Sequence, residues 1–390
     1  MSAAFSPIQI LGFGCVSPLG LGDAATTHCL RHSTDCVSPV RLFPVERCQS
    51  RTAGQVSEEL LEQATAIAPK ARRWSRAAQM VLVALDEALR AAPGFVPDAV
   101  VMGTTSGGMP LGENFFRAIS AGKPAWKETR RVRSYMPQQP VREALEIYHF
   151  DIPVRIVSTA CSSGTSALGM ACQMIRSGAA RRVLAGGYDA LSEMVFSGFD
   201  CLRASTSEKC RPFDQERTGL ALGEGAAVFC LEKGSDGLCV TGYGSATDTH
   251  HLTQPHPSGS GPLAAMQRAV LSAGIDPASV DYINAHGTGT PLNDASEAKA
   301  LLELFPNVPV SSTKGMTGHA LGAAGAIEAA ICCLAMREGF LPANINFRTS
   351  EFSLNVVANN IRQAQPRRTL SNSFGFGGAN AAILLEQREA

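Results

Sequence analysis

The chain has 390 residues, 45% of them hydrophobic and 17% charged, and its formal net charge is zero. This composition predicts a compact globular protein of two or three domains, and a neutral chain gives no support to general nucleic-acid binding. Twelve cysteines without the spacing of a small disulfide scaffold predict free thiols in a reducing, cytoplasmic compartment. No apolar run reaches the roughly 18 residues of a membrane span, and residues 1–7 lack the pattern of a signal peptide.

The predicted elements alternate between strands and helices in chain order. The first half is expected to contain strands at 8–14, 98–103, 153–158, 182–187 and 225–232, and helices at 21–31, 75–92, 112–121 and 164–177. The second half is expected to contain strands at 236–245, 280–285, 308–312 and 379–386, and helices at 262–274, 294–304 and 322–337. Such alternation predicts a layered α/β fold, and without a low-complexity linker the halves should pack as one body.

Segments of the second half repeat segments of the first. At an offset of 154 residues, Ser158-Thr159 matches Ser312-Thr313, and 223–232 matches 377–386. At other offsets, 10–14 matches 240–244 and 100–105 matches 283–288. The matches predict a duplicated α/β unit with halves 1–235 and 236–390, the alternative being chance similarity of glycine-rich strand ends. In such a duplication, the turns that carry Cys161 and residues 314–319 are related and face one cleft.

Cys161 lies where a predicted strand, 153–157, gives way to a helix expected from Gly164 onward. Unpaired N–H groups and the positive end of the helix dipole meet at such a junction. They favour a thiolate, and cysteines in this setting have pKa values lowered from about 8.5 to about 3.5–7.5. The small neighbours Ser162 and Ser163 leave room for a substrate at the sulfur. A buried, inert cysteine is the competing interpretation.

Two histidines follow predicted strands far downstream of Cys161. His286 precedes a loop of glycine and threonine, and His319 opens a helix of small residues. Both therefore lie at strand ends, where α/β proteins place their chemistry. Their spacing is not that of local metal ligands, so no metal site is expected. One thiol and two imidazoles suit acyl transfer followed by carbon–carbon bond formation.

Lys314 and Glu328 are candidates for a supporting role at this site. Lys314 precedes His319 in the same loop, and Glu328 follows on the next predicted helix. A buried pair of these two residues would hold the loop, whereas a solvated lysine is the alternative. The three remaining downstream histidines, His250, His251 and His256, are interpreted as structural or surface residues.

Four motifs resemble the β-ketoacyl-acyl-carrier-protein synthases, in their elongating (type I/II) branch. They occupy residues 159–164, 286–290, 314–325 and 372–380, and the segments 211–214 and 222–225 are also similar. The resemblance runs nearly end to end, and it implies the thiolase-like fold, a duplicated α-β-α-β-α layered sandwich. It also implies decarboxylative Claisen condensation of a Cys161-held acyl chain with malonyl carrier protein, an acyltransferase activity.

The resemblance assigns residues as follows: catalytic roles to Cys161, His286, His319, Lys314, Glu328 and Phe374, and substrate-binding roles to Thr288, Thr290 and Phe376. Cys161 is the expected nucleophile, and the two histidines are expected to promote decarboxylation and stabilise the enolate. The N–H groups of Phe374 and Cys161 are expected to form the oxyanion hole. No cofactor is expected to be bound, because substrates arrive on the phosphopantetheine arm of the carrier protein.

The implied partners are an acidic acyl carrier protein and a second ketosynthase-like chain, in a homodimer or in a heterodimer with a chain-length factor; no nucleic acid or membrane partner is expected. The predicted carrier-docking residues are basic: Lys70, Arg72, Arg73, Arg76, Lys209 and Arg211. An ordinary solvated surface is the alternative for these side chains.

Competing functions differ in their cysteines. A thiolase would carry a second cysteine near the C-terminus, and residues 372–380 contain none. A non-catalytic chain-length factor would lack the nucleophile, and it remains the alternative function. Small residues at 103–108, where bulky ones often shape the acyl pocket of the family, leave fatty-acid synthesis and a specialised polyketide or polyene pathway both open.

Overall fold

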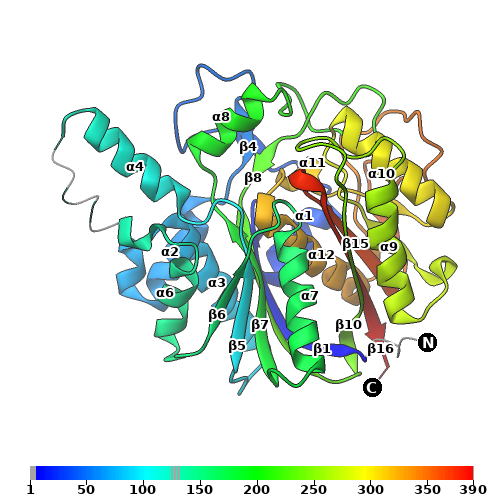
Figure 1. The fold of residues 1–390 in the computed structure, drawn as a ribbon, viewed down its shortest axis with the longest axis horizontal. Coiled ribbons are helices and arrows are strands. Elements are labelled where there is room, and N and C mark those ends of the chain that lie inside the picture. Colours follow the sequence, from blue (N-terminus) through cyan, green and yellow to red (C-terminus); the bar gives the residue numbers. More distant parts are fainter. Residues whose placement is uncertain (1–5, 124–125, 127–128, 130–131, 390) are drawn as a thin grey trace.

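The computed structural model describes residues 6–389, apart from 124–125, 127–128 and 130–131 (Figure 1). Residues 1–5, which form most of the segment inspected for a signal peptide, lie outside the described residues. Among the described helices, none is both long and apolar enough to cross a membrane.

The central sheet of the described residues has 11 strands: two halves of five strands each, and β2, which pairs with β1 beside this order. In the first half the strand order is β6-β5-β7-β9-β1, and in the second it is β10-β16-β15-β11-β12. The halves join where Ile8 and Gln9 of β1 pair with Val240 and Cys239 of β10. The strands of the first half are β1 (Ile8–Ser17), β5 (Ala99–Gly103), β6 (Val154–Val157), β7 (Arg182–Asp189) and β9 (Gly225–Lys233). Those of the second are β10 (Gly237–Thr247), β11 (Tyr282–Asn284), β12 (Val310–Ser311), β15 (Arg368–Phe374) and β16 (Ala379–Arg388).

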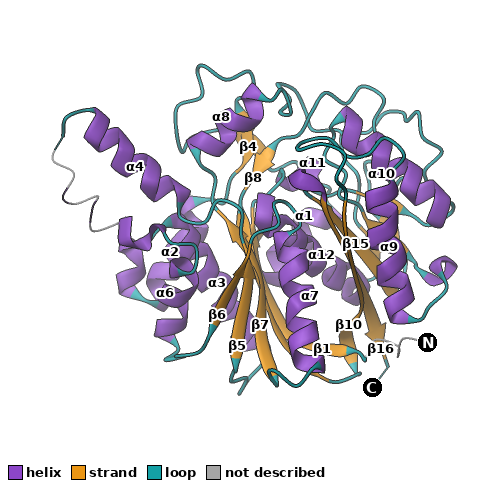
Figure 2. Cartoon of the chain, in the orientation of Figure 1, coloured by secondary structure: helices purple, strands orange, loops and turns teal. Residues whose placement is uncertain are grey.

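Helices form one inner and two outer layers around this sheet (Figure 2). The inner helices α7 (Ser163–Arg176) and α12 (Ala324–Glu338) contact each other and strands of both halves. On the outside, α3 (Arg76–Ala91) packs on β1 and β9 and contacts α6 (Gln139–Ile147). Its counterpart α9 (Ser260–Ala273) packs on β10 and β16 and contacts α10 (Pro291–Leu304). This is the layered sandwich that the sequence predicted.

The strand order confirms the predicted duplication. Read outward from the β1–β10 junction, both halves run through two antiparallel neighbours and then two parallel ones. The repeated segments fall on equivalent strands: β9 and β16 begin 154 residues apart, and so do the turns after β6 and β12. The other two matches pair β1 with β10 and β5 with β11. The division into units 1–235 and 236–390 stays a prediction.

Helix α12 shows why the inner layer is so tightly packed. Residues 324–336 are all buried, which is expected for a helix that is apolar on every side and packed against both halves of the sheet. Glycines allow its close approach to α7: a Cβ on Gly164 would lie 2.8 Å from the Ala326 nitrogen, and one on Gly325 would lie 2.1 Å from Thr165 Oγ1. The charged residue inside this apolar helix, Glu328, therefore needs a partner.

The remaining elements are shorter or more peripheral. The helices are α1 (Gly22–Arg31), α2 (Glu58–Ile67), α4 (Met109–Ser120), α8 (Glu193–Cys201), α11 (Lys314–Thr317), and the 3₁₀ turns η1 (Pro69–Arg73), η2 (Arg133–Tyr135), η3 (Pro277–Ser279), η4 (Leu321–Ala323) and η5 (Phe376–Gly378). The strands are β2 (Gly20–Leu21), β3 (Val37–Pro39), β4 (Thr52–Gly54), β8 (Leu222–Gly223), β13 (Phe340–Leu341) and β14 (Arg362–Gln363). Helix α4 has no buried residue and projects from the body (Figure 1).

Candidate active site

The turn that carries Cys161 connects β6 to α7. The residue before it, Ala160, has φ +49°, a left-handed conformation that a non-glycine residue adopts only when its surroundings hold it there. Ser163 supplies such a hold, because its Oγ donates to the Ala160 carbonyl at 2.6 Å and accepts from the Thr159 N–H at 2.9 Å. Cys161 itself is 5% exposed, so its sulfur lies at the bottom of a cavity.

The protonation state of Cys161 differs from the sequence-based expectation. Burial raises the pKa of its thiol to about 11, although the Lys314 charge and the Phe376 N–H act in the opposite direction. The prediction of a lowered pKa was therefore wrong. It considered the start of the helix but not the loss of solvation, which disfavours the charged form more strongly. The free protein holds Cys161 as a thiol.

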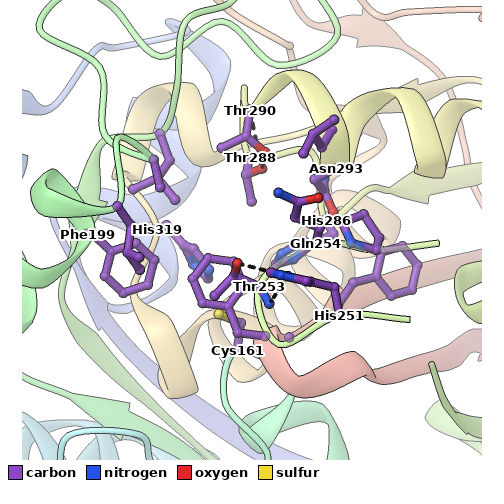
Figure 3. A pocket seen from close by; sticks show the side chains of 18 of the residues that line it. Cys161, Phe199, His251, Thr253, Gln254, His286, Thr288, Thr290, Asn293 and His319 are labelled. Carbon is purple, nitrogen blue, oxygen red and sulfur yellow. Dashed lines mark hydrogen bonds between the residues drawn. The ribbon is translucent and has the colours of Figure 1, made fainter. Parts of the chain in front are cut away.

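His286 and His319 meet in the same cavity as Cys161 (Figure 3). Their ring centroids are 5.2 Å apart and the rings are nearly perpendicular, at 82°. Burial, followed by the nearby Lys314 charge, holds the pKa of both imidazoles well below its usual value. Both rings are therefore neutral, and a neutral imidazole can donate one hydrogen bond and accept another. Neither nitrogen of His319 has a partner within the described protein, which leaves them free for a substrate.

Lys314 and Glu328 form the buried pair that the sequence suggested. Lys314 is 1% exposed; its Nζ is hydrogen-bonded to Glu328 Oε1 and donates to the His286 carbonyl at 2.6 Å. Burial raises the pKa of Glu328 to about 7, against the opposing effect of the lysine. The pair thus fixes the backbone of one histidine and places a positive charge beside both.

Two further carboxylates support the loop of His286, and sequence reasoning missed both. Glu297 accepts the N–H groups of His286 and Gly287, each at 2.8 Å. Asp294 accepts the Thr288 N–H at 3.1 Å. Both lie on the first turns of α10 and are fully buried. The signal for them was available, since two acidic residues three apart follow the loop directly and acidic side chains near a helix start commonly bind backbone N–H groups.

A cavity of about 310 Å³ leads from the surface to Cys161 and both histidines. Its walls include Thr288 and Thr290, whose hydroxyl oxygens are 2.8 Å apart. The two predicted phenylalanines line it at different depths. Phe374 lies against His286, with ring centroids 5.7 Å apart, and Phe376 stacks on Phe199 at 5.4 Å. Thr288, Thr290 and Phe376 thus all line the cavity that contains Cys161.

The predicted oxyanion hole needs one correction. The backbone N–H that reaches the sulfur of Cys161 belongs to Phe376, not to Phe374 as expected. Phe374 is the last residue of β15 and is opposite Asn380 in the β15–β16 ladder, whereas Phe376 follows in the turn that folds over Cys161. Phe376, rather than Phe374, therefore has its backbone N–H beside the Cys161 sulfur.

The loop at residues 248–257 supplies cavity walls that were not predicted. His251, interpreted from sequence as structural or surface, lines the cavity together with Thr253, Gln254 and Asp248 (Figure 3). This loop is bonded to the Phe376 turn, because the Gly377 N–H donates to the Leu252 carbonyl at 2.7 Å. No motif in the sequence marked it.

The predicted docking residues fall into two groups. Arg72 and Arg73 are exposed on η1, and Lys70 and Lys209 are exposed but paired with Glu146 and Asp35, respectively. Two others are held within the protein, so their assignment is corrected. Arg76 is 14% exposed and bound to buried Glu224, and Arg211 is 16% exposed and lies beside Glu208 and Glu216. The partner of Arg76 is fully buried, whereas those of Arg211 are more than half exposed. Little of either arginine side chain is itself exposed, which leaves little of them for a docking protein.

The fold and the site together define the class. In this duplicated thiolase-like sandwich, one buried thiol and two neutral imidazoles meet in the cavity described above, here called the tunnel. Such a protein is a condensing enzyme of the acyltransferase kind.

Comparisons with known proteins agree. The model of the β-ketoacyl synthase N-terminal domain matches residues 5–237, and that of the C-terminal domain matches residues 238–348. The chain is 32% identical to a 3-oxoacyl-[acyl-carrier-protein] synthase 2 of Staphylococcus aureus, over 98% of this chain and 99% of that protein. It is 30% identical to a putative mitochondrial 3-oxoacyl-[acyl-carrier-protein] synthase of Schizosaccharomyces pombe, over 97% and 99%.

Solved structures show the same likeness. One described as the ishigamide ketosynthase/chain length factor superimposes with a TM-score of 0.89 at 30% identity, covering 98% of this chain and 100% of the other. A ketosynthase in complex with its chain length factor from Xenorhabdus doucetiae gives 0.84 at 30% identity, covering 98% of each chain. The chain belongs to the β-ketoacyl synthase family, and the family, fold and acyltransferase class predicted from its motifs are confirmed.

Proposed function

We propose that this chain elongates acyl chains on a discrete carrier protein by decarboxylative Claisen condensation, in fatty-acid or type II polyketide or polyene synthesis. The observation that supports it best is the convergence of Cys161, His286 and His319 on one tunnel, with both imidazoles neutral. In this proposal substrates enter on a phosphopantetheine arm along Thr288 and Thr290, and no other cofactor takes part.

In the first half-reaction the sulfur of Cys161 attacks the carbonyl carbon of a carrier-bound acyl thioester. Its proton passes to a neutral imidazole in the cavity, because a thiol with a pKa of about 11 does not ionise unaided at neutral pH. The N–H groups of Cys161 and Phe376 stabilise the negative charge on the carbonyl oxygen. The bond to the pantetheine sulfur then breaks, and that sulfur leaves with the proton.

In the second half-reaction a malonyl thioester occupies the tunnel. Its carbon–carboxylate bond breaks, CO₂ leaves, and the electron pair moves into an enolate whose oxygen carries the charge. His286 and His319 donate hydrogen bonds to this oxygen, which neutral imidazoles can do. The enolate carbon attacks the acyl group on Cys161, and the carbon–sulfur bond breaks. The sulfur leaves as a thiolate and takes up a proton from solvent to regenerate the thiol, and the product remains on the carrier.

For the quaternary state we propose a dimer of two ketosynthase-like chains, either two copies of this chain or this chain with a chain-length factor. Strand β6 ends the described sheet order, with Arg155 exposed, and thus offers an edge for pairing. We also place the protein in the cytoplasm, which suits its twelve cysteines, all of them free.

The alternative is a non-catalytic chain-length factor. The presence of Cys161, correctly placed beside two histidines, favours the enzyme. Mass spectrometry after incubation with an acylated carrier protein separates the two. The enzyme gains the acyl mass at Cys161 and then releases CO₂ and a β-ketoacyl carrier when malonyl carrier is added. A chain that gains no mass alone or with a co-purified partner chain would contradict the proposal.

A further inference from the structure

The buried carboxylate of Asp189, at the end of β7, has no part in the chemistry described above. It accepts five hydrogen bonds: from Thr104 Oγ1 at 2.7 Å, Thr105 N at 2.9 Å, Ser106 N at 2.9 Å, Ser106 Oγ at 2.7 Å and Gly322 N at 2.6 Å. Three of these donors are backbone N–H groups, which can only donate. The ionised form of Asp189 therefore fits this environment, although burial raises its pKa.

Through these bonds Asp189 reaches both catalytic turns. On one side, Thr105 Oγ1 donates to the Ala160 carbonyl at 3.1 Å, directly before Cys161. On the other side, Gly322 follows His319 by three residues in the chain. A single carboxylate thus connects the turn of the nucleophile to the turn of a catalytic imidazole.

The duplication explains why a carboxylate lies there. In the first half of the sheet, Asp189 of β7 is opposite Gly225 of β9. In the second half, Gly375 is opposite Ala379 of β16, and Ala379 is 154 residues beyond Gly225. Asp189 and Gly375 are therefore equivalent positions in the two copies. The glycine leaves room beside the nucleophile, because a Cβ on Gly375 would lie only 3.1 Å from the Cys161 nitrogen.

The turns beside these two positions are equivalent as well. Leu321 has φ +52° and precedes Gly322, just as Ala160 has φ +49° and precedes Cys161. In the proposed reaction the N–H of Cys161 is an oxyanion donor, whereas the equivalent N–H of Gly322 donates to Asp189. The turn of Gly322, which is equivalent to the turn of Cys161, is therefore closed to a substrate. The Asp189 carboxylate occupies the place that corresponds to the substrate oxyanion.

We propose that Asp189 is a positioning residue for the condensation. By filling the closed counterpart of the oxyanion pocket, its carboxylate fixes residues 104–106 and Gly322, and through them the mutual placement of Cys161 and His319. This inference rests on the proposed function, since it concerns the geometry of that reaction. Its negative charge also adds to the effect of burial in raising the pKa of the Cys161 thiol.

The test uses the full-length protein with Asp189→Asn, which keeps the side-chain size but removes the charge and one acceptor. We expect roughly 10- to 100-fold slower single-turnover acylation of Cys161, because small misplacements of reacting groups have effects of that size. We also expect the midpoint of Cys161 alkylation by iodoacetamide to move to lower pH, with the other cysteines unaffected in peptide mass spectrometry. General destabilisation would label buried cysteines indiscriminately.

Glu87→Gln provides the matched control. Glu87 also accepts backbone N–H groups, from Cys15 at 2.8 Å and Asp23 at 3.2 Å, and does not line the tunnel. The Glu87→Gln variant should therefore leave the acylation rate and the midpoint of Cys161 alkylation unchanged. If Asp189→Asn does not fold, Thr105→Val carries the test, because it removes only the bond to Ala160 and should slow acylation by about fivefold.

Acylation of a folded Asp189→Asn or Thr105→Val variant at the wild-type rate would overturn the positioning role, and so would an equal loss in Glu87→Gln. If the wild-type protein itself accepts no acyl group, the proposed function fails, but the alkylation profile still decides the inference. An unmoved midpoint in Asp189→Asn would then reject it, and a lowered midpoint confined to Cys161 would support it.

Discussion

The buried pair of Lys314 and Glu328 gives the sharpest test of how this site is held together. Lys314→Met keeps much of the side-chain volume but removes the charge and both hydrogen bonds. It leaves the His286 carbonyl without this donor and Glu328, 3% exposed, without its cation. Removing one partner of a buried pair costs about 3–5 kcal/mol, a large share of the roughly 5–15 kcal/mol that stabilises a typical domain.

The double variant Lys314→Met/Glu328→Gln separates stability from electrostatics. Without an uncompensated charge, most of the lost free energy of unfolding should return, since replacing both members of a buried pair is often nearly neutral. The effect of the missing Lys314 charge on the pKa values of the two histidines should persist. The Lys314 charge lowers the pKa of His286 and His319, so both values rise once it is gone, and the acid limb of malonyl-carrier decarboxylation should move to higher pH in both variants.

Urea unfolding followed by circular dichroism measures the free energy of unfolding, and CO₂ release between about pH 5 and 9 measures the position of the acid limb. A loss of less than about 1 kcal/mol in Lys314→Met, or a double variant no more stable than the single one, would refute the account of the pair. An acid limb that stays in place would show that burial alone keeps the imidazoles neutral.

Other substitutions test the remaining roles. Cys161→Ala should give no acyl-enzyme and no condensation, whereas Cys161→Gln should still release CO₂ from malonyl carrier. His319→Ala should slow that release by roughly 10²-fold even when Cys161 is loaded, measured in a single turnover. Charge reversal at the exposed Arg72 and Arg73 should raise KM for carrier-bound substrate at unchanged kcat and weaken its salt dependence; an unchanged KM would remove them from the docking face. Alkylation of Cys161 in the wild type should have its midpoint near pH 11, and a midpoint below pH 8 would contradict the burial effect.

The sequence predicted most of the large elements because their periodicity is strong, but it missed helices α2, α6 and α8 and strand β15. That strand contains Ser371, Asn372 and Ser373, all fully buried, in a stretch that looks like a polar loop. Two of them are bonded to residues around the site: Ser373 Oγ is 2.8 Å from Thr165 Oγ1, and Asn372 Nδ2 donates to Glu297 at 3.3 Å. A pattern of hydrophobicity cannot reveal a strand whose core-facing side chains are hydrogen-bonded.

Residue roles could be predicted only as far as the motifs fixed them. The motifs named Cys161 and both histidines, and the internal repeat correctly placed the turns of Cys161 and His319 in one cleft. They could not show that Arg76 forms an ion pair with buried Glu224, which lies nearly 150 residues later in the chain. Nor could they show that the N–H beside the Cys161 sulfur belongs to Phe376. Each of these facts depends on contacts between distant segments, which spacing along one chain does not encode.

The corrected pKa of Cys161 changes the view of how the site works. A thiolate at the bottom of the tunnel would be reactive toward any electrophile that entered, whereas a buried thiol acts only when a positioned thioester and a neutral imidazole are present together. The same low polarity strengthens the hydrogen bonds that the two imidazoles donate to an enolate. Burial therefore makes the Cys161 thiol less acidic, but it improves the stabilisation of the enolate charge that develops in the second half-reaction. Lys314 moderates this loss of acidity, since its charge opposes the rise in the thiol pKa, and it adds to the larger effect of burial in lowering the pKa of His286 and His319.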